Sequence, residues 1–254
     1  MDRRKLAEGI LAAARKAAGK ILEIYNGDFA VRSKNDESPV TDADEAGEKI
    51  ILAELAVIAP AIPVIAEESV AAGRIPEIGD GPFFLVDPLD GTREFINRNG
   101  EFTVNIALIE NGIPTLGAVV LPALDTAYWV DGEGVAWRQK GTAAAESIST
   151  RPPAPDGLVV VASKSHRDSK TDEYLARLPV KEVISAGSSA KLCRVAEGSA
   201  DLYPRLGRTM EWDIAAGHAV LRAAGGRIER LDNGEPLTYG KEGLDNPHFA
   251  AWGR

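Results

Sequence analysis

Two aspartates, three positions apart, follow a short apolar run. Pro82-Phe83-Phe84-Leu85-Val86 leads directly into Asp87-Pro88-Leu89-Asp90-Gly91-Thr92. The apolar run predicts a buried strand, and carboxylates at the end of a buried strand lose hydration unless a positive charge meets them. A divalent cation is one such charge, and backbone N–H groups in the loop that follows could hold an anion. The same residues also fit an ordinary Asx turn stiffened by proline.

Other acidic residues stand where the sequence predicts the ends of strands and helices. Glu67 and Glu68 follow the apolar segment 62–66, a second predicted strand. Adjacent side chains on a strand point to opposite faces, so we expect only one of them to face Asp87. Glu68 is expected to be solvated. Asp213 and Asp44 each fit the start of a helix as capping residues, and the residues alone assign both a structural role.

A small-residue turn, Gly187-Ser188-Ser189-Ala190-Lys191, opens another predicted helix. Its backbone N–H groups, hydroxyls and lysine could hold a phosphate, or Ser188 could simply cap the helix. His166 lies in a polar loop that is solvated by default. His218 fits a partly buried helical position, and the single cysteine, Cys193, a small packing residue.

The charge balance limits the class of ligand. With 29 basic and 38 acidic residues the formal charge is −9, which argues against binding a nucleic acid polymer. The three histidines show no zinc-ligand spacing, so we expect any metal to be bound by oxygen, as Mg²⁺ or Mn²⁺ are. No apolar run reaches the length of a membrane span, and one cysteine fits a reducing cytoplasm. We expect a cytoplasmic protein, with peripheral attachment at the inner membrane as a variant.

Periodicity indicates a mixed α/β (α+β) chain in two parts. Helices are expected over 3–25 and from Thr41 to Pro60, and antiparallel strands from 102 to about 138. The proline-rich segment Arg151–Pro155 is the best linker candidate, which divides the chain into residues 1–150 and 151–254. An alternation of strands and helices follows the linker: strand 158–162, helix 169–177, strand 183–185, a helix after Ser189, and a last helix from Asp213 to Gly225.

Three of these segments together resemble the Mg²⁺-dependent phosphomonoesterase superfamily that includes inositol monophosphatase and fructose-1,6-bisphosphatase. They are Glu67 after its strand, Asp87-Pro88-Leu89-Asp90-Gly91-Thr92, and Trp212-Asp213, in that order. The resemblance implies the layered αβαβα sugar-phosphatase fold. It also implies an N-terminal part that carries the metal-binding loops and a C-terminal part that completes the active site.

Further segments are similar to the CysQ branch of that superfamily, the bacterial 3'(2'),5'-bisphosphate nucleotidases. The similar segments are 38–44, Glu94-Phe95-Ile96, 99–108, Gly187-Ser188-Ser189 and 200–205, and the match runs from about residue 30 to Phe249. The chain departs from that branch at Ala66, Arg93, Lys164 and Ala190. The resemblance implies a phosphatase that converts 3'-phosphoadenosine 5'-phosphate to AMP and phosphate.

The resemblance also implies roles for individual residues. Two or three Mg²⁺ ions, replaceable by Mn²⁺, would be held by Glu67, Asp87, the Leu89 carbonyl, Asp90 and Asp213. Asp44 would act on a third ion or on the water network, and Thr92 with Glu67 would orient the attacking water. The implied substrate-binding residues are Glu67, Leu89, Asp90, Gly91, Thr92, Gly187, Ser188, Lys191 and Asp213. For the 5'-phosphate the candidates are Gly187, Ser188, Lys191, Lys164, His166 and Arg205.

Other functions remain open from the sequence. Inositol monophosphatase or fructose-1,6-bisphosphatase activity would use the same metal ligands. A non-catalytic nucleotide-binding protein on the same fold, or a Mg²⁺-independent structural protein, belongs to a different class. Nothing in the sequence separates a monomer from a homodimer.

Overall fold

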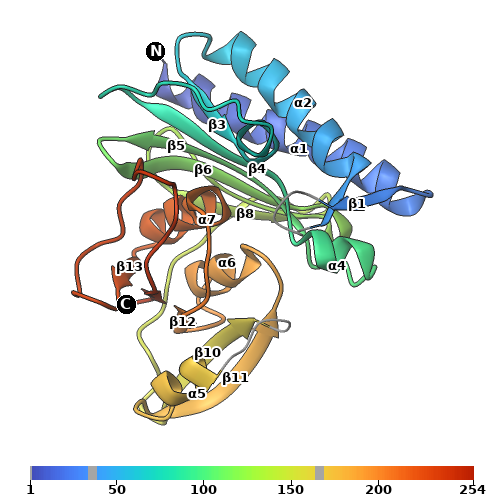
Figure 1. Ribbon diagram of the computed structural model, residues 1–254. Helices are drawn as coiled ribbons and strands as arrows, with labels where there is room; N and C mark the ends of the chain where they lie inside the picture. The colour runs from blue at the N-terminus through green and yellow to red at the C-terminus, as the bar shows by residue number, and fades with distance from the viewer. Residues whose placement is uncertain (1, 34–38, 164–168) are drawn as a thin grey trace.

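The computed structural model describes residues 2–33, 39–163 and 169–254, and two long helices cover one face of its larger sheet (Figure 1). These are α1 (Arg3–Asn26) and α2 (Asp42–Ile58). The sheet has the order β3-β4-β5-β6-β7-β8-β9. Its strands are β3 (Val64–Ala66), β4 (Phe83–Asp90), β5 (Thr103–Glu110), β6 (Ile113–Leu121), β7 (Thr126–Val130), β8 (Ala136–Lys140) and β9 (Glu146–Ser147).

A second sheet lies beyond two further helices. Helices α6 (Ala190–Ala196) and α7 (Glu211–Ala223) lie between the sheets, and α5 (Ser169–Leu175) lies outside the second one (Figure 1). The second sheet has the order β11-β10-β12-β14-β13: β11 (Val180–Ala186), β10 (Leu158–Ser163), β12 (Leu202–Arg205), β14 (Phe249–Trp252) and β13 (Arg227–Arg230). Helix, sheet, helix, sheet and helix therefore succeed one another, which confirms the predicted αβαβα architecture.

Short elements complete the fold around one end of β4. An antiparallel pair of strands, β1 (Val31–Ser33) and β2 (Pro39–Thr41), precedes α2. Two short helices follow strands of the larger sheet: α3 (Glu67–Ala71) follows β3, and α4 (Thr92–Ile96) follows β4. The 3₁₀ turn η1 (Pro122–Leu124) follows β6. The amphipathic pattern explains why α1 forms where it was predicted: Leu6, Ile10, Ala14 and Ile21 are all buried on one side. Asp2 caps this helix by accepting from the Arg4 backbone N–H at 3.1 Å.

The predicted Asx turn at Asp87 is present: its Oδ1 accepts the Leu89 backbone N–H at 2.9 Å. The turn lies within β4, where the pairing with β5 shifts register between Asp87 and Asp90. Regular alternation would place side chains three positions apart on opposite faces, and a β-bulge of this kind re-aims them. One local prediction is wrong: Glu67 and Glu68 do not extend a strand, because they begin α3. The alternation argument used to separate the two glutamates therefore does not apply.

Both sheets contribute to the main apolar core. The larger cluster of buried side chains includes Phe84 and Ile106 from the first sheet, and Tyr203 and Phe249 from the second. Segment 151–155 connects β9 to β10 and so lies between the sheets in the chain. The division into residues 1–150 and 151–254 stays a prediction.

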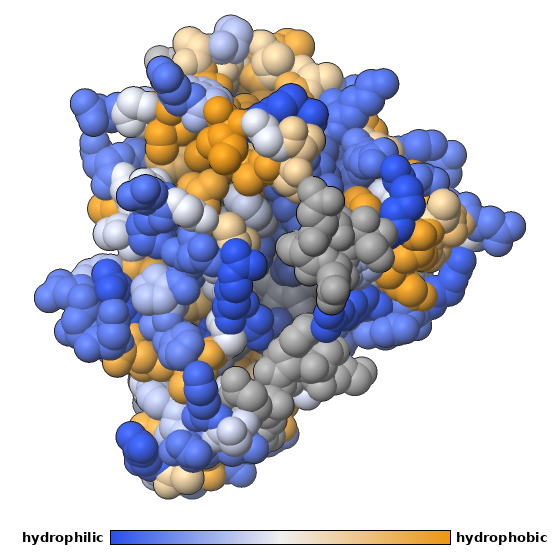
Figure 2. Space-filling view, in the orientation of Figure 1, coloured by the Kyte–Doolittle hydropathy of each residue, from blue (hydrophilic) through white to orange (hydrophobic). Residues whose placement is uncertain are grey.

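Hydrophilic side chains cover most of the face shown in Figure 2, with smaller apolar patches between them. Scattered exposed apolar side chains, such as Val57 and Ile75, are ordinary on a folded protein. Across residues 2–33, 39–163 and 169–254, no helix has the length and apolar character needed to span a bilayer.

Acid should destabilise the protein through a histidine in the core. His218 of α7 is 4% exposed, and its Nδ1 lies 2.8 Å from the Tyr239 hydroxyl. Burial, and then the Arg222 charge, lower the His218 pKa from 6.5 to about 3. Between pH 6.5 and about pH 3, His218 therefore binds a proton in the unfolded state but not in the native state. The stability that neutral His218 contributes is complete above pH 6.5 and is lost as pH falls toward 3, at up to about 1.4 kcal/mol per pH unit.

Comparison with His218→Gln isolates this effect, because other titrating groups are common to both proteins. Between pH 7 and pH 5, the free energy of unfolding of the wild type should fall by about 2 kcal/mol more than that of the variant. Urea unfolding at the two pH values measures the difference. Parallel pH profiles would show that His218 is not responsible.

Candidate active site

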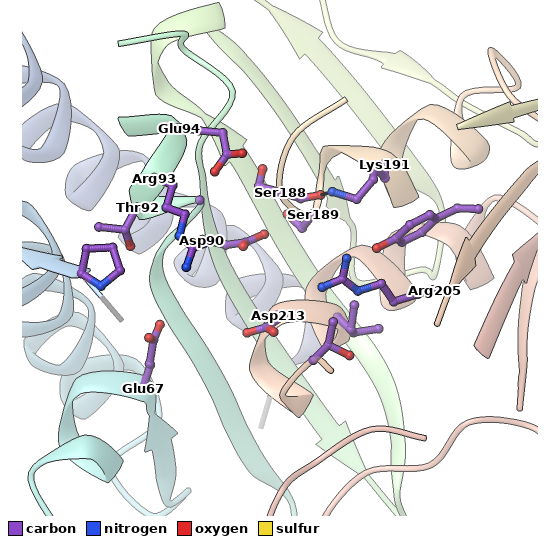
Figure 3. Close-up of a pocket in the computed structure, with 15 residues that line it drawn as sticks. Glu67, Asp90, Thr92, Arg93, Glu94, Ser188, Ser189, Lys191, Arg205 and Asp213 are labelled. Carbon is purple, nitrogen blue, oxygen red and sulfur yellow. Dashed lines mark hydrogen bonds between the residues drawn. The ribbon is translucent and has the colours of Figure 1, made fainter. Parts of the chain in front are cut away.

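A cavity of about 300 Å³ opens where β4, α3, α6, β12 and α7 meet. Figure 3 shows Glu67 and Thr92 on one side of it, Lys191 and Arg205 on the other, and Asp90 and Asp213 between them. The complete lining is Pro39, Glu67, Asp90, Gly91, Thr92, Arg93, Glu94, Ser188, Ser189, Lys191, Tyr203, Arg205, Thr209, Asp213 and Ile214. Residues more than 140 positions apart in the chain therefore form one site.

Asp87 is buried near three other carboxylates, those of Glu67, Asp90 and Asp213, whose charges act on it. Asp87 is 1% exposed, and its Oδ1 accepts the Leu89 backbone N–H at 2.9 Å. Burial, and then the charges of Glu67, Asp90 and Asp213, raise the Asp87 pKa well above its usual range. Burial, and then the charges of Asp90 and Glu67, raise the pKa of Asp213. In the protein without a cation these acids tend to retain protons.

A nearby lysine and a backbone donor partly neutralise Asp90. Burial raises its pKa to about 6, opposed by the Lys191 charge and by a hydrogen bond from the Ser189 backbone. Asp213 uses one oxygen locally: its Oδ2 accepts the Met210 backbone N–H at 2.8 Å at the start of α7. The predicted capping role of Asp213 is therefore present alongside its place in the cavity.

The donor chemistry of this group fits a hard divalent cation. Carboxylate oxygens and a nearby carbonyl, that of Leu89, are ligands that Mg²⁺ prefers, and a cation would relieve the repulsion that raises the Asp87 and Asp213 pKa values. Within the described ranges, no three His, Cys, Asp or Glu side chains already converge on one point as a ligand set.

Asp44 joins the start of α2 to Thr92. Its Oδ2 accepts from both the backbone N–H and the hydroxyl of Thr41, each at 2.7 Å, which confirms the predicted capping box. Its Oδ1 accepts from the Thr92 hydroxyl at 3.2 Å. The Thr92 hydroxyl also lies 3.4 Å from the Leu89 carbonyl oxygen, and whichever acceptor takes its one proton, its lone pairs can accept a hydrogen bond from a water molecule in the cavity.

Two glycines allow the halves of the site to approach. Gly91 has φ +92°, and a Cβ there would lie 3.3 Å from the Glu101 carbonyl oxygen. At Gly187 a Cβ would lie 2.7 Å from the same oxygen, closer than any side chain permits. The 187–189 turn is also tied to β5, since the Ser189 hydroxyl lies 2.8 Å from that of Thr103. The backbone at Glu101 thus packs against both the end of β4 and the turn before α6.

The side of the cavity opposite Glu67 offers hydrogen-bond donors. Lys191 is 5% exposed, its Nζ donates to the Ser188 carbonyl at 2.5 Å, and burial lowers its pKa to about 8. The Ser188 hydroxyl and the Arg205 Nε are buried and have no hydrogen-bond partner among the described residues. An ammonium, a guanidinium and a hydroxyl that gather in this way suit an anion such as phosphate.

Most predicted site residues lie in or directly behind this cavity. Glu67, Asp90, Gly91, Thr92, Ser188, Lys191, Arg205 and Asp213 line it. Asp44, Asp87 and Leu89 are buried without lining it, and Gly187 packs against Glu101. Lys164 and His166 lie outside the described residues. Sequence reasoning did not assign Tyr203 to the site, although its spacing of two from Arg205 on a strand places both on one face.

The chain matches a known family over almost its whole length. The model of the inositol monophosphatase family matches residues 2–251. The 3'(2'),5'-bisphosphate nucleotidase CysQ of Salmonella typhimurium is 44% identical over 247 residues, which cover 96% of this chain and 98% of that protein. The protein of the same name from Haemophilus influenzae is 31% identical over 251 residues, with 98% and 93% covered.

Solved structures agree with this assignment. CysQ from Bacteroides thetaiotaomicron superposes with a TM-score of 0.83 at 38% identity, covering 98% of this chain and 97% of its own. The Thermotoga maritima IMPase superposes with a TM-score of 0.80 at 23% identity, covering 99% and 92%, and so supports the fold alone. Family model, sequence identity and fold agree: the chain belongs to the inositol monophosphatase family.

Proposed function

We propose that this protein is a Mg²⁺-dependent phosphatase that removes the 3'-phosphate of 3'-phosphoadenosine 5'-phosphate, giving AMP and phosphate. The observation that carries the proposal is the two-sided cavity: acids suited to metal ions face donors suited to a second anion (Figure 3). A substrate with two phosphates uses both sides. The names of the CysQ relatives supply the nucleotide.

In this proposal, Glu67, Asp87 and the Leu89 carbonyl hold one ion, and Asp87, Asp90 and Asp213 hold a second. Asp44 acts on a third, weaker position or on the water network, and Mn²⁺ can replace Mg²⁺. Ions held there would supply a lower pKa for the attacking water and would neutralise phosphate charge. Residues 1–150 then supply Glu67, Asp87 and Asp90, and residues 151–254 supply Asp213 and the groups proposed for the 5'-phosphate.

The chain's own residues position the reacting groups. Thr92, whose hydroxyl contacts Asp44, accepts a hydrogen bond from the attacking water, and Glu67 holds the same water. The backbone N–H groups of Gly91 and Thr92 hold phosphate oxygens. The water oxygen attacks phosphorus in line with the departing ribose oxygen, with no phosphoenzyme. Positioning and charge neutralisation carry most of the rate in such a reaction.

The 5'-phosphate, which stays on the product, is assigned to the donor side of the cavity. Ser188 and Arg205 offer a buried hydroxyl and a buried N–H without partners in the described part of the chain. Lys191 offers an ammonium beside them, 5.4 Å from the centre of the Tyr203 ring. Gly187 permits the turn and does not line the cavity.

A substrate panel tests the proposal. With saturating Mg²⁺, we expect kcat/KM for 3'-phosphoadenosine 5'-phosphate to exceed that for inositol 1-phosphate or fructose 1,6-bisphosphate by on the order of 10²-fold, because the first rival lacks a second phosphate for the donor side and the second lacks the nucleoside. Phosphate release with and without a chelator measures turnover. A preference for inositol 1-phosphate would reject the substrate assignment. A Tm increase with Mg²⁺ and AMP but no turnover would indicate a non-catalytic binding protein.

A further inference from the structure

A buried carboxylate on α2 contacts the helix that carries Glu67. Glu48 lies four residues after Asp44, on the same side of α2, and is 4% exposed. Its Oε2 accepts the Glu68 backbone N–H at 2.7 Å, and its Oε1 accepts the Ser69 hydroxyl at 2.6 Å. Both partners are uncharged groups in the first turn of α3. The charge of Glu48 is therefore stabilised by this turn.

Helix α3 needs such a partner. It spans only Glu67–Ala71, and Ala66 before it provides no side-chain cap. The first N–H groups of a helix have no partners within the helix, and so short a helix is unstable in isolation. A carboxylate at the N-terminal end satisfies an N–H group and interacts favourably with the helix dipole. Glu48 thus caps α3 from a different helix.

The cap determines where Glu67 lies. Glu67 is the first residue of α3 and lines the cavity, so its carboxylate direction follows from the backbone that Glu48 holds at the next residue. The same stretch of α2 also packs on β4, because a Cβ at Gly47 would lie 3.3 Å from that of Pro88. Helix α2 is therefore a common support for Glu67 and for the Asp87–Asp90 bulge.

We propose that Glu48 is a positioning residue that holds Glu67 in the geometry needed to share a divalent cation with Asp87. This inference rests on one part of the proposed function, the binding of Mg²⁺ by Glu67 and Asp87. Glu48 does not line the cavity, so it acts through Glu67 and not on the substrate. Groups that orient metal ligands in this way typically change metal affinity by about 10- to 100-fold when they are replaced.

Glu48→Gln tests the proposal, with Glu54→Gln as the matched control. Glutamine keeps the size of Glu48 but presents an amide NH₂ to one of two donors. Glu54 lies on the same helix, partly exposed, and pairs with Lys16 at 2.5 Å. In calorimetric titrations with Mg²⁺ alone, Kd should rise by about 10-fold or more for Glu48→Gln and stay within about 2-fold of wild type for Glu54→Gln.

Two further readouts separate positioning from general damage. Hydrogen exchange of a peptide covering 64–71 in the metal-free protein should be faster in Glu48→Gln and unchanged in Glu54→Gln. In turnover assays, the Mg²⁺ concentration for half-maximal rate should rise, while KM for the nucleotide at saturating Mg²⁺ stays within about 2-fold. A purely structural defect would lower the melting temperature without raising the half-maximal Mg²⁺ concentration relative to KM for the nucleotide.

An unchanged Mg²⁺ Kd in folded Glu48→Gln would overturn the inference. Should that variant not fold, Ser69→Ala decides, since it removes one of the two donors and keeps the other. We expect it to weaken Mg²⁺ binding by about 3-fold, and no change would overturn the inference equally. A wild type that binds Mg²⁺ but hydrolyses no nucleotide would reject the proposed function and leave this comparison valid.

Discussion

Replacing Asp90 by asparagine is expected to lower kcat/KM for metal-dependent phosphate release by on the order of 10³-fold or more, with the fold retained. Asp90 lies between the acidic and basic sides of the cavity (Figure 3). Its charge acts on Asp87 and Asp213 and on Lys191. Asparagine keeps the shape and one oxygen, but it removes the charge that would hold an ion between these residues.

The stability of the metal-free variant provides a second measurement. The Asp90 charge helps raise the pKa of both Asp87 and Asp213, so removing it relieves repulsion in a buried site. We therefore expect metal-free Asp90→Asn to melt no lower than wild type. It should also lack the Tm increase that Mg²⁺ with AMP produces in the wild type.

Asp232→Asn is the matched control for both measurements. Asp232 is half exposed, pairs with Arg230 in a surface turn and does not line the cavity. It should leave turnover and the ligand-induced Tm increase unchanged. Asp90→Asn with more than about a tenth of wild-type turnover would show that Asp90 is not a required metal ligand.

Local patterns in the sequence predict the regular elements well. Helix α1 follows from apolar residues at helical spacing, and the capping box at Thr41 and Asp44 marks the start of α2. Strand β4 follows from its apolar run. These features depend on residues close together in the chain, which is why periodicity and capping rules identify them.

The irregular parts of the site depend on distant contacts and could not be predicted in the same way. The bulge between Asp87 and Asp90 exists against its partner strand β5, and α3 is capped by Glu48, 20 positions earlier. The second role of Asp44, its contact with Thr92, spans 48 positions. A single sequence shows the acids but not the contacts that aim them, so the resemblance to a known family supplied their roles.

Lys191→Met is expected to reduce discrimination between substrates more than catalysis itself. Lys191 is buried on the donor side of the cavity, with Nζ 2.5 Å from the Ser188 carbonyl. A charge-assisted contact to a buried phosphate costs about 2–5 kcal/mol to remove. We therefore expect kcat/KM for 3'-phosphoadenosine 5'-phosphate to fall by about 10²-fold. For 3'-AMP, which lacks the 5'-phosphate, the fall should be smaller by at least about 10-fold.

The ratio of the two kcat/KM values is the informative quantity, because Lys191 also affects the metal side. Its charge acts on Asp90, so the variant should change metal binding to the same extent for every substrate. Measuring at saturating Mg²⁺ and comparing the two substrates cancels that effect. Lys181→Met, which removes an exposed lysine paired with Asp156, should change neither value. Equal losses on both substrates would show that Lys191 acts only on the acidic side of the cavity. Other groups would then have to hold the 5'-phosphate. In the described part of the cavity, the remaining donors without partners are those of Arg205 and Ser188.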